Sequence, residues 1–373
     1  MMSGTSMDGI DVALLETDGE SIEAFGPVAG RAFTPGEREL LREAVTEAAF
    51  LRHRDDRPAL LTEAEDFVTE SHAQAVGDFL DDNGLSREEI DVIGFHGQTV
   101  LHRPEDRLTV QLGDGQRLAD LTGVKVVYDF RGNDMAQGGQ GAPFVPVYHR
   151  ALVLAARLDL PAAVVNIGGV ANVTWVGEDG HFLAFDTGPG NALIDDWVRQ
   201  TTGASHDENG ALAAQGRADN KRLEALLRSP YFLRKPPKSL DRNDFTLTLM
   251  EGLSPADGAA TLTAFTAGAL VCAVAHFPVP PKAVVVVGGG ARNRSLMAAL
   301  DTLLPGQLLR ADDIGWSADG LEAQAFAFLA VRSLKGLPLS FPTTTGVESP
   351  TPGGLLAQPA SPLVLSFDSP GSA

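Results

Sequence analysis

The sequence predicts an α/β fold divided into two domains. Segments with helical patterns and segments with strand patterns alternate along the chain, which is typical of α/β proteins. The 373 residues are enough for two domains, each with a substantial core. At two places, over residues 3–15 and near residue 168, a glycine-rich turn directly precedes a strand with alternating apolar residues. This repetition suggests two related halves.

The elements of the first half follow from apolar periodicity. A strand is expected after the first turn, and a helix is expected over residues 62–84. Thr62 and Glu65 have the spacing of a capping box at the start of that helix, and Gly84 can end it. Three short apolar strands, "DVIGF", "LTVQL" and "VKVVY", follow within residues 91–128.

A glycine-dense segment, "RGNDMAQGGQGAPFVP", separates the two halves. It can be a flexible linker or a binding loop built from backbone, and we place the domain boundary there. The expected domains are residues 1–132 and 133–355, with the tail 356–373 rejoining the first. The second begins with a helix near residues 149–157 and closely spaced strands over 162–186, which suit an antiparallel meander. Its other expected elements are helices near 190–202, 219–228, 256–276 and 319–335, and a buried strand with a following helix within 283–300.

Composition excludes several kinds of partner. Forty-nine acidic against 29 basic side chains give a net charge of −20, so neither nucleic acid nor an anionic membrane is an expected partner. The single cysteine, Cys272, can form no internal disulfide and is expected to be a small buried residue. The chain start has no signal-peptide pattern, and no stretch was expected to span a bilayer. A cytoplasmic location fits best.

The turn before the first strand has the chemistry of a phosphate-binding loop. Backbone amides in a glycine-rich turn and the hydroxyls of Thr5 and Ser6 can donate to phosphate oxygens. Asp8 or Asp11 could hold Mg²⁺ through water. A tight β-turn with Asp8-Gly9 at its corner is the simpler interpretation. The Walker pattern is absent, which excludes a P-loop protein.

Two further segments join a strand to a helix through glycines. In "VVVVGGGARNRSLM" the turn could pack against a nucleotide, but the dinucleotide fingerprint would need a glycine where Asn293 stands. The alternative interpretation is a turn with a purely structural role. In "AFDTGPGNALIDDW" a strand ends at Asp186, which could be a general base or a helix cap.

Three side chains elsewhere are candidates for substrate contacts. His96 directly follows a strand and has too few neighbours for a metal site. Arg131 could bind a carboxylate or form an interdomain salt bridge. Glu322 lies in the first turn of a helix, where an acidic residue commonly compensates the helix dipole.

In this order, the segments resemble the anhydro-N-acetylmuramic acid kinase family. The matching motifs are "MSGTSMDGID", "GFHGQTVLHRP", "QLGDG", "DFRGNDMAQGGQGAPFVP", "NIGGVANVT", "FDTGPGN", "VVGGGARN" and "GLEAQAFAFLA". They cover residues 2 to about 354. The resemblance implies the actin, Hsp70 and hexokinase fold, with two RNase H-like domains around a central cleft.

The resemblance also implies a reaction and its participants. With ATP and Mg²⁺, the 1,6-anhydro ring of anhydroMurNAc would be opened by water while O6 receives the γ-phosphate, in bacterial cell-wall recycling. Asp186 would be the base, Glu322 a second catalytic candidate, and His96, Gln98 and Arg131 would contact the sugar. The residues implied at the nucleotide are Gly4, Thr5, Ser6, Met7, Asp8, Gly9, Ile10, Asp11, Gly168, Gly169, Gly288, Gly289 and Asn293. A homodimer is left open.

One departure from the family pattern concerns the chain start. Family members carry an apolar strand before this Ser-Gly-Thr-Ser motif, and here only Met1 and Met2 precede it. We expect that residues upstream are missing from this sequence. The rival functions are a kinase of the same superfold for another small substrate, and a non-catalytic protein switched by nucleotide.

Overall fold

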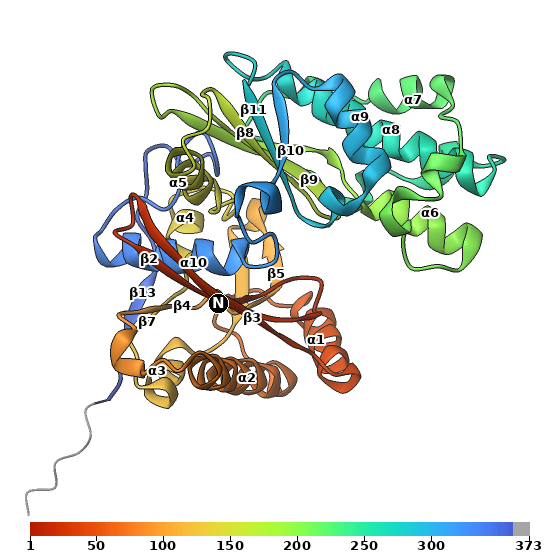
Figure 1. Cartoon of the computed structure of the whole chain (residues 1–373). Coiled ribbons are helices and arrows are strands. Elements are labelled where there is room, and N and C mark those ends of the chain that lie inside the picture. Colours follow the sequence, from red (N-terminus) through yellow and green to blue (C-terminus); the bar gives the residue numbers. More distant parts are fainter. Residues whose placement is uncertain (361–373) are drawn as a thin grey trace, which may run out of the picture.

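The computed structural model describes residues 1–360 and shows two lobes (Figure 1). The last part of the expected tail, residues 361–373, lies outside the described residues. The first lobe contains the segments drawn in red and orange, and the second contains those drawn in green and cyan. Helices α5 and α10 lie between them.

The first lobe contains a mixed sheet in the order β3-β2-β1-β5-β6. The strands are β1 (Met2–Ser3), β2 (Gly9–Thr17), β3 (Ile22–Ala32), β5 (Gln98–Arg103) and β6 (Leu108–Leu112). β1, β2 and β3 are antiparallel neighbours, which places the first turn between β1 and β2. β5 runs parallel to β1 at a single position, and β6 pairs antiparallel with β5.

A smaller sheet, β13-β7-β4, continues the first lobe. It comprises β4 (Ile93–Gly94), β7 (Val126–Tyr128) and β13 (Leu355–Ala357). β4 and β7 are parallel, and β13 brings the chain's C-terminal part back to the first lobe. The amino group of Met1 donates to the Gly94 carbonyl at 2.9 Å and the His96 N–H donates to the Met1 carbonyl at 3.3 Å. The first residue therefore links the two sheets.

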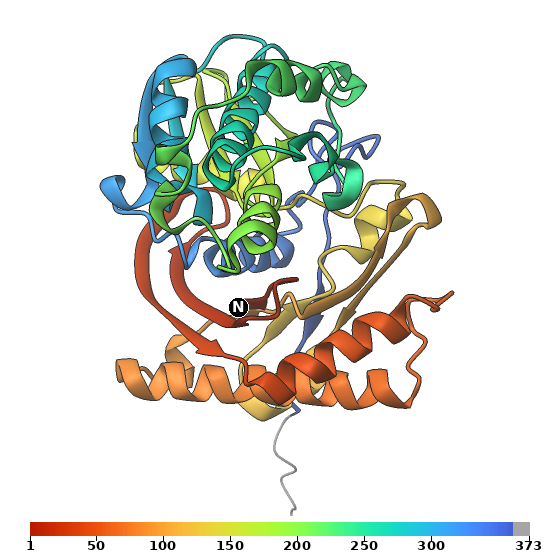
Figure 2. The ribbon, with the colours of Figure 1, turned by 90° about the vertical axis from the view of Figure 1, so that its right-hand side faces the viewer.

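Helices cover this lobe on the side away from the second lobe (Figure 2). The helices in the first 155 residues are α1 (Pro35–Ala48), α2 (Ala59–Asn83), α3 (Gly115–Thr122), α4 (Gly132–Ala136) and α5 (Pro146–Ala155). α1 has a capping box of Thr34 and Glu37, a signal that our prediction missed.

The start of α2 corrects one prediction and its end confirms another. The helix begins at Ala59, one turn before Thr62, so the predicted capping box is wrong. Glu65 instead forms an ion pair with Arg57 at 3.0 Å. Gly84 ends the helix in the left-handed conformation, with φ of 63°, as predicted.

The second lobe is built on one sheet in the order β10-β9-β8-β11-β12. Its strands are β8 (Ala162–Ile167), β9 (Val170–Val176), β10 (Phe182–Pro189), β11 (Ala283–Val287) and β12 (Gln307–Arg310). The predicted antiparallel meander is confirmed by β8, β9 and β10. β11 and β12 then add in parallel to β8, so that the glycine turns after β8 and β11 meet at one end of the sheet.

The helices of the second half agree with their predicted positions to within a few residues. They are α6 (Ala192–Thr202), α7 (Asn220–Leu227), α8 (Pro255–Val274), α9 (Arg294–Leu303) and α10 (Leu321–Leu334). Contrary to expectation, α8 is long and apolar enough to cross a membrane, but 61% of its apolar window is buried in the protein. Such a helix is also typical of a core, and α8 packs on α6, α7, α9 and β10. Cys272 on this helix is half-buried rather than buried.

The two lobes share one pattern of strands, which the first lobe divides between its two sheets. In each lobe an antiparallel meander of three strands is followed by two parallel strands, with β4 and β7 corresponding to β11 and β12. The α/β class and the pair of RNase H-like domains are thereby confirmed. The resemblance between the two glycine turns reflects their equivalent positions in the repeat.

Helix α10 bears on the predicted domain division. It lies within residues 133–355, which we assigned to the second domain, yet it packs on β2, β4 and β7 of the first lobe. Its Phe326 contacts Phe130 with ring centroids 5.3 Å apart. The boundary at residue 132 stays a prediction, and α10 returns to the first lobe as β13 does.

Candidate active site

Asp186 lies at an irregularity of β10, held by backbone on both sides. The pairing of β10 with β9 shifts between Asp186 and Gly188. The Asp186 N–H donates to the Lys238 carbonyl at 3.0 Å, and the Leu240 N–H donates to Asp186 Oδ2 at 2.9 Å. α6 begins at Ala192 with Asn191 in the N-cap position, so the helix-cap interpretation of Asp186 is wrong.

The surroundings of Asp186 suit a base. Burial raises the pKa of this carboxyl group to about 6, while the Leu240 N–H and the positive charge of Lys238 act in the opposite direction. A carboxylate whose pKa lies near neutral pH accepts a proton more readily than an exposed one and is still ionised at pH 7.

A cavity of about 730 Å³ opens at Asp186 and is walled by both lobes. The first lobe contributes residues of 102–105, at the tip of the β5–β6 hairpin, and the segment 138–142 contributes the glycine-dense loop. The second lobe contributes Asp186 and residues 239–241. A small molecule in this cavity would touch both lobes and the carboxylate.

The glycine-dense segment is a braced loop, not a flexible linker. Buried Asp134 accepts the Gly141 N–H at 2.6 Å through one oxygen and the Thr345 hydroxyl at 2.6 Å through the other. The Gln140 N–H also donates to the Thr345 carbonyl at 2.8 Å. These bonds fix the loop that faces Asp186, which favours the binding-loop interpretation.

The first turn joins β1 to β2 and presents polar groups to solvent. The Met7 N–H donates to the Gly4 carbonyl at 3.1 Å, which closes the turn over residues 4–7, before the predicted corner at Asp8-Gly9. The Ser6 hydroxyl donates to Asp8 at 2.8 Å, and the Gln98 side-chain amide donates to the Gly4 carbonyl at 3.1 Å. Gln98 thus stabilises the first turn.

Several carboxylates surround this turn. Burial raises the pKa of Asp11, and the negative charges of Asp8 and Asp319 raise it further. The Glu322 side chain is in contact with solvent, but many protein atoms surround its carboxyl group. Desolvation therefore raises its pKa, the neighbouring Asp11 adds to this effect, and Arg131 opposes it. Glu322 is part of this charged group, and dipole compensation alone does not describe it.

His96 and Arg131 form one unit beside that group. The Arg131 guanidinium donates to His96 Nε2 at 3.0 and 3.2 Å and to the Gly141 carbonyl, and it lies 5.5 Å from the centre of the Phe144 ring. Burial and the Arg131 charge hold the pKa of His96 well below its usual range, so the imidazole is neutral. Within residues 1–360 Arg131 makes no ion pair, so the salt-bridge interpretation is not supported.

The glycine turns of the second lobe lie together at one end of its sheet. The Asn191 side-chain amide donates to the Ile167 carbonyl, just before Gly168 and Gly169. After β11, Gly288 has φ of 79°, and a Cβ there would lie 2.4 Å from Asn166 Oδ1. Gly169 and Gly289 are exposed. The two turns thus offer accessible backbone amides at the place where α/β proteins bind ligands.

Asn293 has a structural partner. Its Oδ1 accepts the Leu296 N–H at 3.0 Å and caps α9, and a short 3₁₀ helix (Gly289–Arg292) separates β11 from that cap. The direct strand-to-helix turn of a dinucleotide fingerprint is therefore not formed. Asn293 is only 8% exposed. Contact between Asn293 and a nucleotide stays a prediction.

One ion pair joins the turn after β11 to the loop that precedes α10. Arg292 donates to Asp319 at 2.9 Å, and Asp319 is one of the charges that raise the pKa of Asp11. The charge of Asp319 therefore acts on both the turn after β11 and Asp11 of the first lobe. Neither Arg292 nor Asp319 was predicted, because each is an ordinary charged residue of a loop in the sequence.

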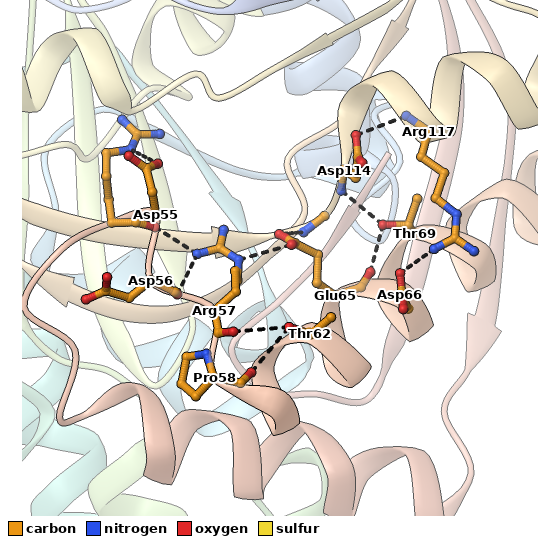
Figure 3. A network of polar contacts seen from close by, with 12 residues as sticks. Asp55, Asp56, Arg57, Pro58, Thr62, Glu65, Asp66, Thr69, Asp114 and Arg117 are labelled. Atoms are coloured by element: carbon orange, nitrogen blue, oxygen red, sulfur yellow. Dashed lines mark hydrogen bonds and ion pairs between the residues drawn. The ribbon is translucent and has the colours of Figure 1, made fainter.

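A second cavity, of about 300 Å³, adjoins His96 at the carboxyl ends of β4 and β7. Its arginines are paired, Arg54 with Asp129 at 2.7 Å and Arg57 with Glu65 at 3.0 Å. Figure 3 shows how this network ties α2 to the start of α3. The Gly113 N–H donates to Glu65 and the Asp114 N–H donates to Thr69, so the "QLGDG" loop is fixed.

The described residues contain no preformed metal-binding site made of side chains. Residues 1–360 hold no group of three or more His, Cys, Asp or Glu side chains placed to ligate a metal ion. Asp8 and Asp11 near Glu322 could take part in binding a cation that a ligand brings, because the mutual repulsion of these carboxylates would be relieved by it.

Comparison with known proteins gives consistent results. A family model described as anhydro-N-acetylmuramic acid kinase matches residues 1–358. A relative of that name from Methylorubrum populi is 55% identical over 369 residues, which cover 96% of this chain and 98% of the relative. A relative of the same name from Rhodopseudomonas palustris (strain HaA2) is 56% identical over 360 residues, with coverage of 96% and 98%.

Solved structures are more distant. The activator of the 2-hydroxyisocaproyl-CoA dehydratase from Clostridium difficile, with bound ADPNP, is similar at 16% identity with a TM-score of 0.42. The match covers 90% of this chain and 95% of that one. The ligand-bound xylulose kinase from Lactobacillus acidophilus is similar at 12% identity with a TM-score of 0.35, covering 67% and 53%. Both scores are too low to carry an argument.

Proposed function

The chain belongs to the anhydro-N-acetylmuramic acid kinase family, and on that premise we propose that it opens 1,6-anhydro-N-acetylmuramic acid and phosphorylates its O6 with ATP. The products are N-acetylmuramic acid 6-phosphate and ADP. This reaction returns a cell-wall sugar to metabolism in peptidoglycan recycling. Identity above 50% along nearly the whole chain supports carrying the activity over.

The observation that carries the proposal is the position of Asp186. It is a partly buried carboxylate, with a pKa of about 6, on the wall of a cavity enclosed by both lobes. A base in that setting can take a proton from water that attacks C1 of the sugar.

The bond changes balance without a separate acid. The water oxygen forms a bond to C1 while its proton goes to Asp186, and the electron pair of the C1–O6 bond moves to O6. O6 bonds to the γ-phosphorus as the bond from that phosphorus to the ADP oxygen breaks. An inverting glycosidase needs an acid for its leaving oxygen. Here phosphorus captures that oxygen, so one carboxylate suffices.

The loops of both lobes would hold the triphosphate. We assign the amides of residues 4–11, with the hydroxyls of Thr5 and Ser6, to the phosphates, and the turns at Gly168-Gly169 and Gly288-Gly289 to the nucleotide on the opposite side. Their support is the charge of Asp319, which pairs with Arg292 after β11 and also raises the pKa of Asp11 in the first lobe. Mg²⁺ bound with ATP would neutralise charge on the transferring phosphoryl group, and Asp8 and Asp11 are the residues that would hold it through water.

The first lobe would bind the sugar. Arg131, held by His96 and Gly141, presents a fixed positive charge, and neutral His96 offers a buried Nδ1 that has no partner among the described residues. We assign both to sugar contacts, and Gln98, whose side chain bonds to the Gly4 carbonyl, to support of the first turn. Glu322 would lie at the reacting end of the sugar, near Arg131 and Asp11.

The same proposal includes the cellular setting. ATP and the free anhydro sugar are both cytoplasmic small molecules, so we place the protein in the cytoplasm. The net charge of −20 supports the absence of nucleic acid and anionic membrane from its partners.

Mass spectrometry of the reaction tests this function directly. The protein is incubated with ATP, Mg²⁺ and either anhydroMurNAc or one of several other sugars. We expect a product that has gained one phosphoryl group and one water from anhydroMurNAc alone. Phosphorylation of another sugar would indicate a kinase of different specificity, and ATP turnover that is indifferent to every sugar would indicate a nucleotide-switched protein.

A further inference from the structure

A three-residue segment of the second lobe, Lys238–Leu240, lies against Asp186. Its first residue accepts the Asp186 N–H at 3.0 Å, and its last residue donates its own N–H to Asp186 Oδ2 at 2.9 Å. The segment thus fixes the backbone of Asp186 and the direction of its carboxylate. It belongs to a loop that the sequence did not single out.

Lys238 holds this segment in place through a buried ammonium group. The residue is 8% exposed, and Nζ donates to the Tyr231 carbonyl at 3.2 Å. Nζ also lies 4.5 Å from the centre of the Tyr231 ring and 5.5 Å from that of Phe185. Aromatic faces stabilise a cation, and the stabilisation grows where water is excluded.

Both aromatic residues that contact Lys238 are also connected to Asp186. The Tyr231 hydroxyl donates to the Asp186 carbonyl, and Phe185 directly precedes Asp186 in β10. Lys238 therefore contacts one residue that bonds to Asp186 and one that is its neighbour in the strand. Within residues 1–360 its ammonium makes no ion pair with a carboxylate, so its positive charge is not neutralised at close range.

A buried cation with no carboxylate in contact needs a reason, because burial of an ammonium group is costly. We propose that Lys238 is a positioning residue for the base: it clamps the segment that aims the Asp186 carboxylate and places a positive charge against Tyr231 and Phe185, the residues that flank Asp186. This rests on the proposed function, since it assumes that Asp186 is the base.

The other ionisable groups nearby do not supply that charge. Burial raises the pKa values of Tyr231 and Cys272, so both stay neutral around pH 7. His102, Glu105 and Asp241 line the same cavity, but none of them bonds to Asp186. Arg234 lies on the Tyr231 ring at 5.8 Å and acts on Lys238 rather than on Asp186.

The two groups define a range of pH in which both are charged. Burial lowers the pKa of Lys238 to about 8, and burial raises that of Asp186 to about 6. Between these values the carboxylate is ionised and the ammonium is protonated. The pair is therefore complete near neutral pH.

The test compares pH profiles of sugar turnover for Lys238→Met and Lys238→Arg. Methionine keeps an unbranched, apolar stem of similar length and removes the charge, whereas arginine keeps the charge. For Lys238→Met we expect the acid limb of kcat to move up by about one pH unit, so that turnover falls about threefold at pH 6.5 and about tenfold below pH 6. The KM for ATP should stay within about twofold, because the contacts of Lys238 are with Tyr231 and Phe185 and not with the nucleotide turns. In Lys238→Arg the limb should return close to its wild-type position.

Lys235→Met is the matched control. Lys235 is an exposed lysine three positions earlier in the same loop, and its removal should leave the pH profile unchanged. If Lys238→Met does not fold, as judged by circular dichroism, Lys238→Gln gives the same measurement with a polar side chain. Failure of the wild-type protein to turn over the sugar would overturn the proposed function. Normal wild-type turnover with an unmoved acid limb in both neutral variants would overturn the role of Lys238 alone.

Discussion

The two lobes share one pattern of strands but differ in the pairing of the first strand of the meander, β1 or β8. In the second lobe β8 spans Ala162–Ile167 and is paired with β9 on one side and β11 on the other along its length. In the first lobe the equivalent strand β1 is only Met2–Ser3. Beyond it β2 and β4 are not bridged, and a small cavity of about 70 Å³, lined mostly by apolar side chains such as Leu14, Phe79 and Ile93, lies between them.

The surroundings of Asp186 and of the first turn match the two tasks that we assign to the lobes. A base must keep its direction to a fraction of an ångström, and Asp186 is held by the Lys238 carbonyl, which accepts its N–H, and by the Leu240 N–H, which donates to its carboxylate. In the first turn, by contrast, Thr5, Ser6 and Asp8 are exposed. Regions with few buried contacts open at lower cost, so the first turn is the part suited to rearrange around a ligand.

Replacement of the base should give the largest effect. Asp186→Asn removes the proton acceptor and keeps its size, so turnover should fall by about 10²–10⁴, while ATP binding stays nearly intact. Turnover is measured by ADP release, and ATP binding by titration calorimetry. Asp195→Asn, a change at another half-buried aspartate of the same lobe, should be close to wild type. Near-normal turnover in Asp186→Asn would show that the base lies elsewhere.

Replacement in the first turn should act on ATP instead of on the base. Thr5→Ala removes one donor to a phosphate, an interaction with a charged group worth about 1.5–3 kcal/mol, so kcat/KM for ATP should fall about 10- to 100-fold. The acid limb of the pH profile should not move. Thr46→Ala, at an exposed position of α1, is the control. An unchanged kcat/KM for ATP would remove Thr5 and the first turn from the nucleotide site.

The pH profile of the wild-type protein reports on the second lobe. The pKa of Asp186 is raised to about 6, and only the ionised carboxylate accepts a proton. Turnover should therefore be level above about pH 7 and fall about tenfold per pH unit below pH 6. Measurement of kcat at saturating sugar and ATP between pH 4.5 and 8 checks this. A limb near pH 4, the ordinary value for an exposed aspartate, would contradict the described burial.

The smallest expected effect concerns the short central strand. Five apolar β-branched residues added before Met1 can pair between β2 and β4 and bury side chains in the small cavity. Part of that gain is offset by the entropy of ordering the added residues, so we expect the melting temperature to rise by about 2–5 °C. Five Gly and Ser residues in the same place are the control. Equal melting temperatures of the two proteins would show that the added residues do not pair as a strand between β2 and β4.

The sequence predicted the second lobe better than the first. The strands β8, β9 and β10 and the helices α6, α8 and α10 are rich in apolar residues, most of which are buried, and such segments are recognisable in a sequence. α1 and β3 were missed because their apolar residues are sparse: only Leu41, Ala44 and Ala48 are buried in α1. Periodicity shows that a face of α10 is buried and not which sheet buries it, so the packing of α10 on β2, β4 and β7 could not be predicted from it.

The candidate site was predicted where a motif carried it. Asp186 and the glycine turns are recognisable because an acid or a glycine at a strand end has few structural uses. Lys238, Arg292 and Asp319 escaped notice, because a charged residue in a loop is normally solvated and only tertiary packing brings it to the site. Glu322 illustrates the limit, since a first-turn glutamate needs no special explanation until its neighbours Asp11 and Arg131 are known.

The proposed mechanism requires that both lobes contact the same nucleotide and the same sugar, and that Asp186 lies beside the sugar. A crystal structure with a non-hydrolysable ATP analogue and anhydroMurNAc measures this directly. We predict a triphosphate between the first turn and the Gly288-Gly289 turn, and Asp186 hydrogen-bonded to a water that faces C1. A nucleotide bound to one lobe alone, or a sugar whose C1 points away from Asp186, would contradict it.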